Sequence, residues 1–147
     1  MIRPAKAADQ PAVEVIVNEA YAVYIERLGK PPGPMLDDYA ALIAAGAVSV
    51  LETGNSIAAI IVLLAKSDHL LLDNIAVSRE RQSQGLGREL IAFAEAEACR
   101  LGFDEVRLYT HALMIENIAL YTKLGFVITG RGREAGYDRV FMAKRLS

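Results

Sequence analysis

The sequence predicts an α/β protein of the α+β kind, with a mixed but mostly antiparallel central sheet of six to seven strands flanked by about four helices. Strand-like segments at residues 47–52, 57–65 and 70–77 follow one another with only short connections, as antiparallel strands do. A long amphipathic helix then separates the third segment from another strand at residues 105–109. A strand–helix–strand unit of this kind joins parallel strands, so one parallel pair is expected there.

The first third of the chain is predicted to be mainly helical. Asp9 is a favourable N-cap and Pro11 suits the first helical turn, after which apolar residues recur at helical spacing as far as Tyr24. Prolines and glycines crowd residues 29–35, which excludes a helix or a central strand there. We therefore expect a short strand at residues 1–3, a helix from Asp9 to Tyr24, a stiff loop, and a second short helix at residues 36–45 ended by Gly46.

The second half of the chain contains the clearest helix, at residues 85–101. Gly102 follows it as a natural C-cap. Its apolar face is formed by Leu86, Leu90, Phe93, Ala94, Ala98 and Leu101. The remaining expected elements are a strand at 105–109, a helix at 115–124 stopped by Gly125, and strands at 126–129 and 137–144 separated by a glycine-rich loop at 130–136. No repeat or second domain is visible, so a single domain over residues 1–147 is expected.

Composition argues against several functional classes. The chain has 147 residues, is 53% hydrophobic and carries a formal net charge of -2 without clustered Lys and Arg, which argues against nucleic-acid binding. Cys99, expected to be a partly buried thiol, cannot form an intramolecular disulfide, and with only His69 and His111 it cannot build a zinc cluster, so no metal is expected. The longest apolar run, residues 57–65, is about half a membrane span. Residues 1–10 lack the apolar core of a signal peptide, so we expect no membrane partner and a cytoplasmic location.

The clearest functional motif is Gln-Ser-Gln-Gly-Leu-Gly at residues 82–87. It follows the strand that ends at Val77 and opens the long helix. The first backbone N–H groups of a helix have no internal partner, and the helix dipole adds partial positive charge there. Glycines let an anion approach that backbone closely. The segment is therefore expected to hold a phosphate or a pyrophosphate.

The two commonest nucleotide-binding motifs are absent from this segment. A P-loop requires Lys and then Ser or Thr after its last glycine, whereas Arg88 and Glu89 follow Gly87. A dinucleotide fingerprint requires a third small residue where Leu90 stands. For the glycines taken alone, a strand-to-helix turn without any ligand is the open alternative.

The segment resembles the signature Gln/Arg-x-x-Gly-x-Gly/Ala of the GNAT superfamily of N-acetyltransferases, with Gln82, Gly85 and Gly87 in the matching places. The preceding residues 74–77, Asn-Ile-Ala-Val, are similar to the fourth strand of that family. Residues 117–126, Asn-Ile-Ala-Leu-Tyr-Thr-Lys-Leu-Gly-Phe, resemble its tyrosine-bearing helix and the turn that follows. Spacing and element order agree with the family over nearly the whole chain.

The resemblance implies a GNAT-like sheet with its parallel crossover at the cofactor site, acetyl-CoA as acetyl donor and CoA as product. It implies direct transfer of the acetyl group to a primary amine of a small molecule or protein. Many members carry an Asn seven residues before the tyrosine, where Met114 stands here, whereas Asn117 lies on the same helical face. The cofactor-binding residues implied are Ile75, Ala76, Val77, Gln82, Ser83, Gln84, Gly85, Leu86, Gly87, Arg88, Asn117 and Tyr121.

The resemblance supports a catalytic role for one residue, and the residues themselves suggest candidates for a second role. Tyr121 is the candidate general acid, because a phenol is protonated at neutral pH and can donate to a leaving thiolate. Asp73 and His111 are candidate general bases, and a chain of water molecules is the alternative to both. The candidate substrate-binding residues are Glu19, Tyr24 and Asn74.

The sequence leaves three questions open. The same glycine segment would serve a non-catalytic acyl-CoA-binding sensor or interaction module, which is the alternative to an enzyme. The identity of the amine acceptor and the oligomeric state are also open, with a homodimer as one alternative.

Overall fold

Seven strands form one sheet in the order β1-β2-β3-β4-β5-β7-β6. The β1–β2, β2–β3, β5–β7 and β6–β7 pairs are antiparallel, and β4–β5 is parallel. The predicted class, a mostly antiparallel sheet with one parallel pair, is therefore confirmed. The strands are β1 (Ile2–Pro4), β2 (Val48–Thr53), β3 (Ser56–Ala65), β4 (Leu70–Val77), β5 (Glu105–His111), β6 (Val127–Glu134) and β7 (Tyr137–Arg145).

The structure is a computed structural model that describes residues 1–146. Within this range there are five α-helices and three short 3-10 helices. The α-helices are α1 (Gln10–Tyr21), α2 (Val23–Leu28), α3 (Tyr39–Ala44), α4 (Leu86–Arg100) and α5 (Ile115–Lys123), and the 3-10 helices are η1 (Ala7–Asp9), η2 (Gly33–Leu36) and η3 (Arg79–Arg81). The predicted element order is confirmed, with one addition: α2 is a helix separate from α1.

Contacts along the chain divide it into two compact units, which are described separately. Unit 1 comprises Met1–Leu63 and Asn74–Leu90, and unit 2 comprises Leu64–Asp73 and the chain from Ile91 onward. The expectation of a single domain over residues 1–147 stays a prediction.

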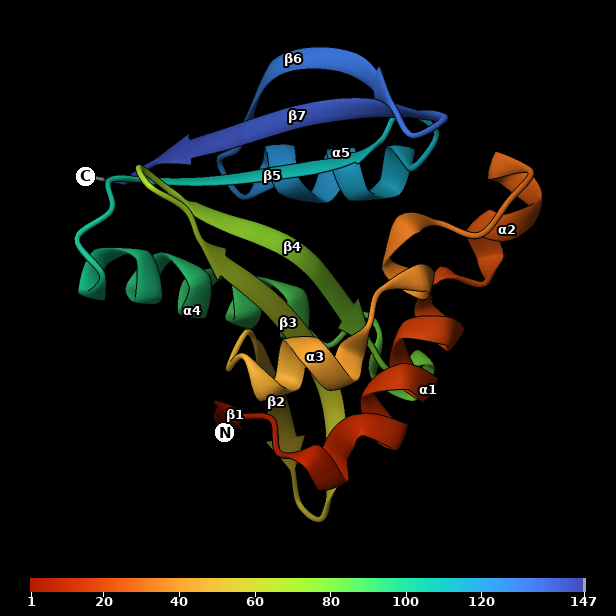
Figure 1. Ribbon diagram of the computed structural model, residues 1–147, viewed down its shortest axis with the longest axis vertical. Helices are drawn as coiled ribbons and strands as arrows, with labels where there is room; N and C mark the ends of the chain where they lie inside the picture. The colour runs from red at the N-terminus through yellow and green to blue at the C-terminus, as the bar shows by residue number, and fades with distance from the viewer. Residues whose placement is uncertain (147) are drawn as a thin grey trace. The chain divides into compact units, whose positions relative to one another are not determined.

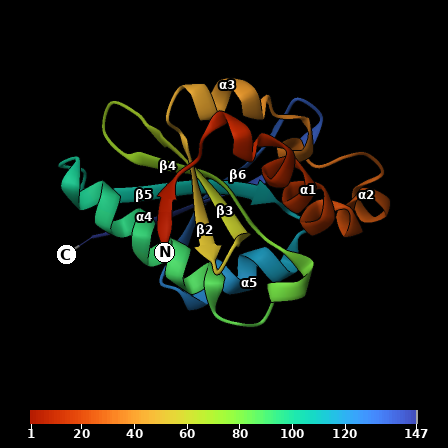
Figure 2. The same cartoon turned by 90° about the horizontal axis from the view of Figure 1, so that it is seen from below.

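In unit 1, helices α1 and α3 lie together on one side of strands β2 and β3 (Figure 2). Val13 and Val17 of α1 are fully buried, as the helical spacing of apolar residues predicts. Strands β2 and β3 contribute further apolar residues to this core, among them Val50 and Ile60, which are also fully buried. The folding of this unit rests on burial of apolar helix and strand faces.

In unit 2, α5 runs alongside β5 and β7 (Figure 1). Val106 and Leu108 of β5 and Val140 and Met142 of β7 are almost completely buried, whereas their neighbours in sequence are more exposed. This alternation assigns one face of the two strands to the core. The other face carries polar and aromatic side chains.

Asp9 does not cap α1 in the way the sequence suggests. It stands at the N-cap position, but its carboxylate makes no capping hydrogen bond there. The carboxylate instead accepts the backbone N–H of Lys6 at 2.7 Å and pairs with Arg3 at 2.8 Å. The carboxylate therefore secures the turn before α1 and ties it to β1.

The predicted loop at residues 130–136 is wrong, because β6 continues as far as Glu134. The turn consists of Ala135 and Gly136 alone, with φ of 51° and 83°. Positive φ at both central residues is the geometry of a two-residue hairpin turn. The glycines upstream of this turn lie in β6, which ends the strand order and is exposed, so small residues are tolerated there.

Four smaller expectations also need correction. Residues 33–36 form a 3-10 helix within the predicted stiff loop, and α3 begins only at Tyr39, where the Asp38 carboxylate accepts the N–H of Ala41 at 3.1 Å. Leu101, which follows α4, and Cys99, in its last turn, are both exposed, whereas the adjacent Ala98 is fully buried. Gly102 has a φ of 84°, as its predicted C-cap role requires.

No helix in the described part of the chain, residues 1–146, is long and apolar enough to cross a membrane.

The Arg3–Asp9 pair makes stability depend on pH. The hydrogen bond from Arg3, followed by that from the Lys6 backbone, holds the pKa of the Asp9 carboxyl below its ordinary value of 3.8. A carboxyl with a lowered folded-state pKa contributes stability above its unfolded pKa and loses it as the pH falls through the folded value. We predict that Asp9→Asn lowers the thermal midpoint of unfolding at neutral pH. Below pH 3.8, the midpoint of this variant should decrease less steeply with falling pH than that of the wild type. Equal acid sensitivity in the two proteins, measured by circular dichroism melts, would contradict this.

Candidate functional site

The glycine segment forms an exposed turn between η3 and α4. Gln82, Ser83, Gln84 and Gly85 are all exposed. Gly85 has a φ of 79°, and a Cβ built on it would meet no heavy atom within 4 Å. Ser83 also has a positive φ, 68°, which is uncommon for a residue with a side chain and occurs preferentially at functional sites. The turn therefore presents its backbone to solvent in a conformation that costs energy to maintain.

The first backbone N–H groups of α4 adjoin this turn. The hydrogen bond from the Glu89 N–H to the Gly85 carbonyl, 3.2 Å, is the first that reaches back along the helix. The N–H groups of Leu86, Gly87 and Arg88 therefore come before the helical ladder, where a 15-residue helix concentrates its positive dipole end. The Gln82 amide donates to the Val77 carbonyl at 3.4 Å, which ties the turn to the end of β4. This arrangement suits an anion.

A buried hydrogen-bond network fixes the last half of β4 within unit 1. Asn74 is 2% exposed. Its Oδ1 accepts from the Tyr21 hydroxyl at 2.6 Å, and its Nδ2 donates to the Tyr39 hydroxyl at 2.8 Å. The Ile75 carbonyl lies 2.9 Å from the Tyr21 hydroxyl, and the Pro34 carbonyl accepts from Tyr39 at 2.5 Å. Helix α1, the 3-10 segment η2 and α3 are thus joined to one asparagine.

Sequence reasoning missed both tyrosines of this network. Tyr21 follows Val13 and Val17 at helical spacing, a pattern that gives no sign of a polar partner. A buried tyrosine hydroxyl needs a hydrogen-bond partner, and that requirement is the signal that would have pointed to Asn74. The expectation that Asn74 binds substrate stays a prediction, although both ends of its amide already have protein partners.

The other candidate residues of unit 1 are placed as follows. Glu19 is exposed on α1. Tyr24 is 8% exposed, packs its ring 6.3 Å from that of Tyr21, and carries the Arg27 guanidinium 5.1 Å above it. Ala76 is buried, whereas Ile75 and Val77 are half-buried on the other side of the strand. Arg88 is exposed.

In unit 2, Tyr121 lies near the end of α5 and is 6% exposed. Its ring meets that of Phe126 edge-on at 5.7 Å, and its carbonyl accepts the Phe126 N–H at 3.0 Å. Gly125 has a φ of 102°, and Lys144 Nζ donates to the Leu124 carbonyl at 2.8 Å. The Leu-Gly-Phe turn of the motif therefore anchors the tyrosine that precedes it.

Met114, which stands where the sequence resemblance leads us to expect an asparagine, is buried. Its sulfur accepts from the Thr110 hydroxyl at 3.5 Å and lies 3.7 Å from the Asn117 side-chain nitrogen. The Asn117 amide therefore faces the sulfur that stands in the usual asparagine position.

The two base candidates, both in unit 2, differ in their hydrogen bonds. His111 Nδ1 accepts the Leu113 N–H at 3.0 Å. This bond places the proton of the neutral ring on Nε2, which makes that nitrogen a donor. Asp73 Oδ1 accepts from the Tyr109 hydroxyl at 3.3 Å and retains further acceptor capacity. The geometry thus favours Asp73 over His111 as a proton acceptor.

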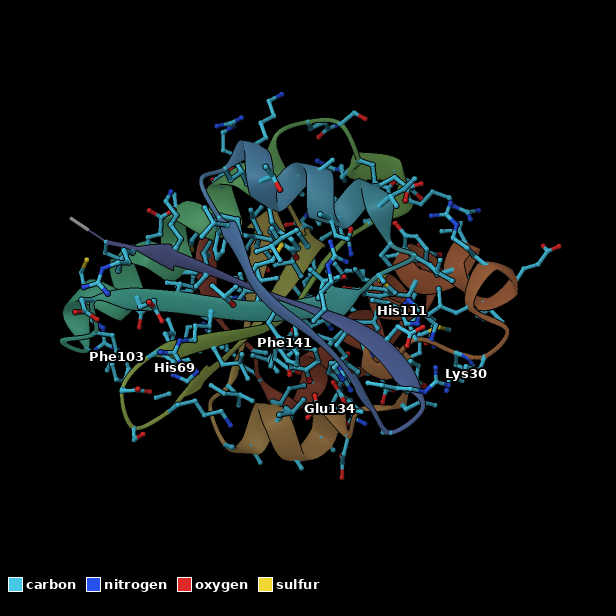
Figure 3. All side chains as sticks on the ribbon, turned by 90° about the horizontal axis from the view of Figure 1, so that it is seen from above. Lys30, His69, Phe103, His111, Glu134 and Phe141 are labelled. Atoms are coloured by element: carbon cyan, nitrogen blue, oxygen red, sulfur yellow. The ribbon has the colours of Figure 1, made fainter. Side chains whose placement is uncertain are left out.

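The two histidines do not form a metal site. Figure 3 shows His111 and His69 at opposite ends of β5. His69 lies in the turn before β4 and contacts the Asp68 carboxylate at 2.7 Å. Among residues 1–146, no group of three or more His, Cys, Asp or Glu side chains could hold a metal ion.

The strand order, the parallel β4–β5 pair and the glycine turn before α4 define the fold of an N-acyltransferase. A family model described as the acetyltransferase (GNAT) family matches residues 13–126. The chain therefore belongs to the GNAT family of acetyltransferases.

Similar proteins fall in the same class. An uncharacterized N-acetyltransferase, YvbK, of Bacillus subtilis (strain 168) is 30% identical over 102 residues, which is 69% of this chain and 64% of that protein. The matched region thus covers less than two thirds of the relative. The Escherichia coli ribosomal-protein-S18-alanine N-acetyltransferase is 26% identical with a TM-score of 0.77, covering 100% of this chain and 94% of that one. The PaiA N-acetyltransferase of Thermoplasma acidophilum, solved with coenzyme A, has the same fold with a TM-score of 0.78 at 18% identity, covering 99% of this chain and 98% of that one.

The Asn74 network yields a prediction about stability. Asn74→Ala removes a buried amide that satisfies two hydroxyls, so we expect a loss of about 1–3 kcal/mol of unfolding free energy. Asn18→Ala is the matched control, because Asn18 is exposed on α1 and alanine favours helix. Urea unfolding of both variants measures the difference. If Asn74→Ala loses no more unfolding free energy than Asn18→Ala, the network contributes no net stability.

Proposed function

We propose that this protein transfers the acetyl group of acetyl-CoA directly to a primary amine. The observation that carries the proposal is the exposed turn at Ser83–Gly85 followed by the first N–H groups of α4. Membership of the GNAT family supports acetyl transfer as the chemistry, and the coenzyme A complex of the Thermoplasma protein supports the cofactor.

The residues present fit the diphosphate of acetyl-CoA. The backbone N–H groups from Ser83 to Arg88 supply donors, and the helix dipole favours negative charge. The open space around the Gly85 Cα leaves room for close approach of phosphate oxygens. The exposed Arg88 guanidinium adds a positive charge beside them. In this proposal the main chain of Ile75–Val77 holds the pantetheine arm as a neighbouring strand would.

The reaction places two demands on the protein. A lysine-like amine has a pKa near 10.4, so at neutral pH only about one molecule in two thousand is the free base, which costs about 4.6 kcal/mol. The leaving thiolate, with a pKa near 8.5, needs a proton or a hydrogen bond. Acetyl-CoA supplies the activated acetyl thioester. The chain's own residues must accept a proton from the amine and donate one to the thiolate.

We assign the thiolate proton to Tyr121. Its phenol is protonated at neutral pH, its ring is anchored by Phe126 and the Leu-Gly-Phe turn, and it occupies the tyrosine position of the family motif. For the amine proton we favour Asp73, directly or through water, because His111 already accepts at Nδ1. Asn117 is assigned to the pantetheine arm on the motif match alone.

The glycine turn can be tested by binding. Gly85→Asp adds bulk, negative charge and left-handed strain where phosphate is proposed to bind, so we expect acetyl-CoA affinity to fall at least a hundredfold by calorimetry. Gly54→Asp is the matched control, because Gly54 has a φ of 61°, also has nothing within 4 Å, and lies in the β2–β3 hairpin. Unchanged affinity in Gly85→Asp would mean that the cofactor binds elsewhere.

Activity separates an enzyme from a cofactor sensor. We expect free thiol to be released from acetyl-CoA in the presence of at least one amine from a panel of amino acids, polyamines and peptides. Tyr121→Phe should lower kcat by about tenfold to a thousandfold while leaving the acetyl-CoA dissociation constant unchanged. Cofactor binding without thiol release for any amine would favour the sensor, and an unchanged kcat in Tyr121→Phe would remove its role as acid.

A further inference from the structure

One face of β5 and β7 in unit 2 gathers cationic and aromatic side chains that the proposed reaction does not yet use. His111 pairs with Arg139 and Tyr109 pairs with Phe141 across the two antiparallel strands. Directly opposed residues project to the same face, as do residues two apart along a strand. Tyr137, two residues before Arg139, therefore shares this face.

The aromatic rings hold the Arg139 guanidinium in place. Its central carbon lies 4.2 Å from the centre of the Tyr109 ring and 5.6 Å from that of Tyr137. Stacking on aromatic faces orients a guanidinium and favours it electrostatically. The Arg139 side chain is only 18% exposed, so it has lost most of its rotational freedom before any ligand arrives.

The hydrogen-bonding capacity of Arg139 is largely unused. Its Nε is buried and makes no hydrogen bond, although the Glu134 carboxylate lies 3.2 Å away outside hydrogen-bonding geometry. Among residues 1–146, its two terminal nitrogens make no hydrogen bond. Of its three nitrogens, only Nε is fully buried without a hydrogen-bond partner. The two terminal nitrogens therefore form an oriented fork of donors on a side chain that is 18% exposed.

His111 places a second polar side chain beside this fork. Because its Nδ1 accepts the Leu113 N–H at 3.0 Å, the neutral ring carries its proton on Nε2. The ring meets Tyr137 edge-on at 6.1 Å, which fixes its orientation on the same face. Directly opposed residues of antiparallel strands have Cβ atoms about 4.5–5.5 Å apart, so one small group can contact both side chains.

We propose that Arg139 and His111 form a carboxylate-binding site, and that the amine acceptor accordingly carries a carboxylate, as an amino acid does. A planar guanidinium fork can bind the two oxygens of a carboxylate through two parallel hydrogen bonds. Glu134 supports the assignment, because its 62% exposed carboxylate already forms an ion pair with the same guanidinium, 3.2 Å from Nε. The identification of the ligand as the amine acceptor rests on the proposed acetyl transfer, but the carboxylate-binding site itself does not.

The activity test compares acceptors that differ only in the carboxylate. Each amino acid of a panel is paired with its carboxamide, and kcat/KM for both is measured by thiol release. We expect Arg139→Gln to lower the ratio of carboxylate to carboxamide kcat/KM by about tenfold to a hundredfold. Comparing ratios cancels the different basicity of the two amines. Arg139→Lys, which keeps the charge but loses the fork, should fall in between.

Two further variants sharpen the result. Arg145→Gln alters an arginine on the same strand that is 75% exposed and pairs with Asp104, so the ratio should stay unchanged. Glu134→Gln removes the competing carboxylate, so the ratio should rise. A fall that is equal for carboxylate and carboxamide would reduce Arg139 to a structural role and overturn the inference, as would an unchanged ratio.

Binding without turnover keeps the inference separate from the proposed function. Ligand-observed NMR with N-acetyl amino acids and their carboxamides should show binding of the acids to the wild type and a loss of about tenfold in affinity for Arg139→Gln. If no amine is acetylated but this selectivity is found, the transfer proposal fails and the site stands. If amines are acetylated without carboxylate selectivity in rate or in binding, the transfer proposal stands and the site fails.

Discussion

The backbone N–H groups that open α4 are the constraint on which the functional account depends. A helix cannot satisfy these donors internally, and here the preceding turn is exposed and held in left-handed conformations at Ser83 and Gly85. In the proposed function, the diphosphate of acetyl-CoA accepts from these N–H groups and is favoured by the helix dipole. The proposed binding of acetyl-CoA starts from this interaction, whereas the identity of the cofactor rests on membership of the GNAT family.

Much of the remaining polar chemistry serves to hold elements in place. Asn74 joins the hydroxyls of Tyr21 and Tyr39 and thereby ties α1 and α3 to the strand that precedes the glycine turn. Stacking between tyrosines holds Arg139 in a similar way. In both cases a buried or half-buried polar group is oriented before any ligand binds, which lowers the entropic cost of recognition.

The sequence predicted best what depends on local pattern. The bounds of β4 and α4 followed from apolar periodicity and from Gly102, whose positive φ ends the helix. Features that depend on contacts between distant residues were not predictable from one sequence. Tyr21 and Asn74 are 53 positions apart, and Arg139 meets His111 only through the β5–β7 register. The Ala135–Gly136 turn was missed because the nearby glycines of an exposed edge strand resemble a loop in composition.

The most direct test is to follow backbone amide resonances while coenzyme A is added to the intact protein. The account predicts that the amide signals of residues 83–88 shift most among those of unit 1, and that Gly85→Asp abolishes the shifts. Saturable binding that leaves these amides unmoved, with changes confined to other parts of the chain, would contradict the claim that the start of α4 holds the diphosphate.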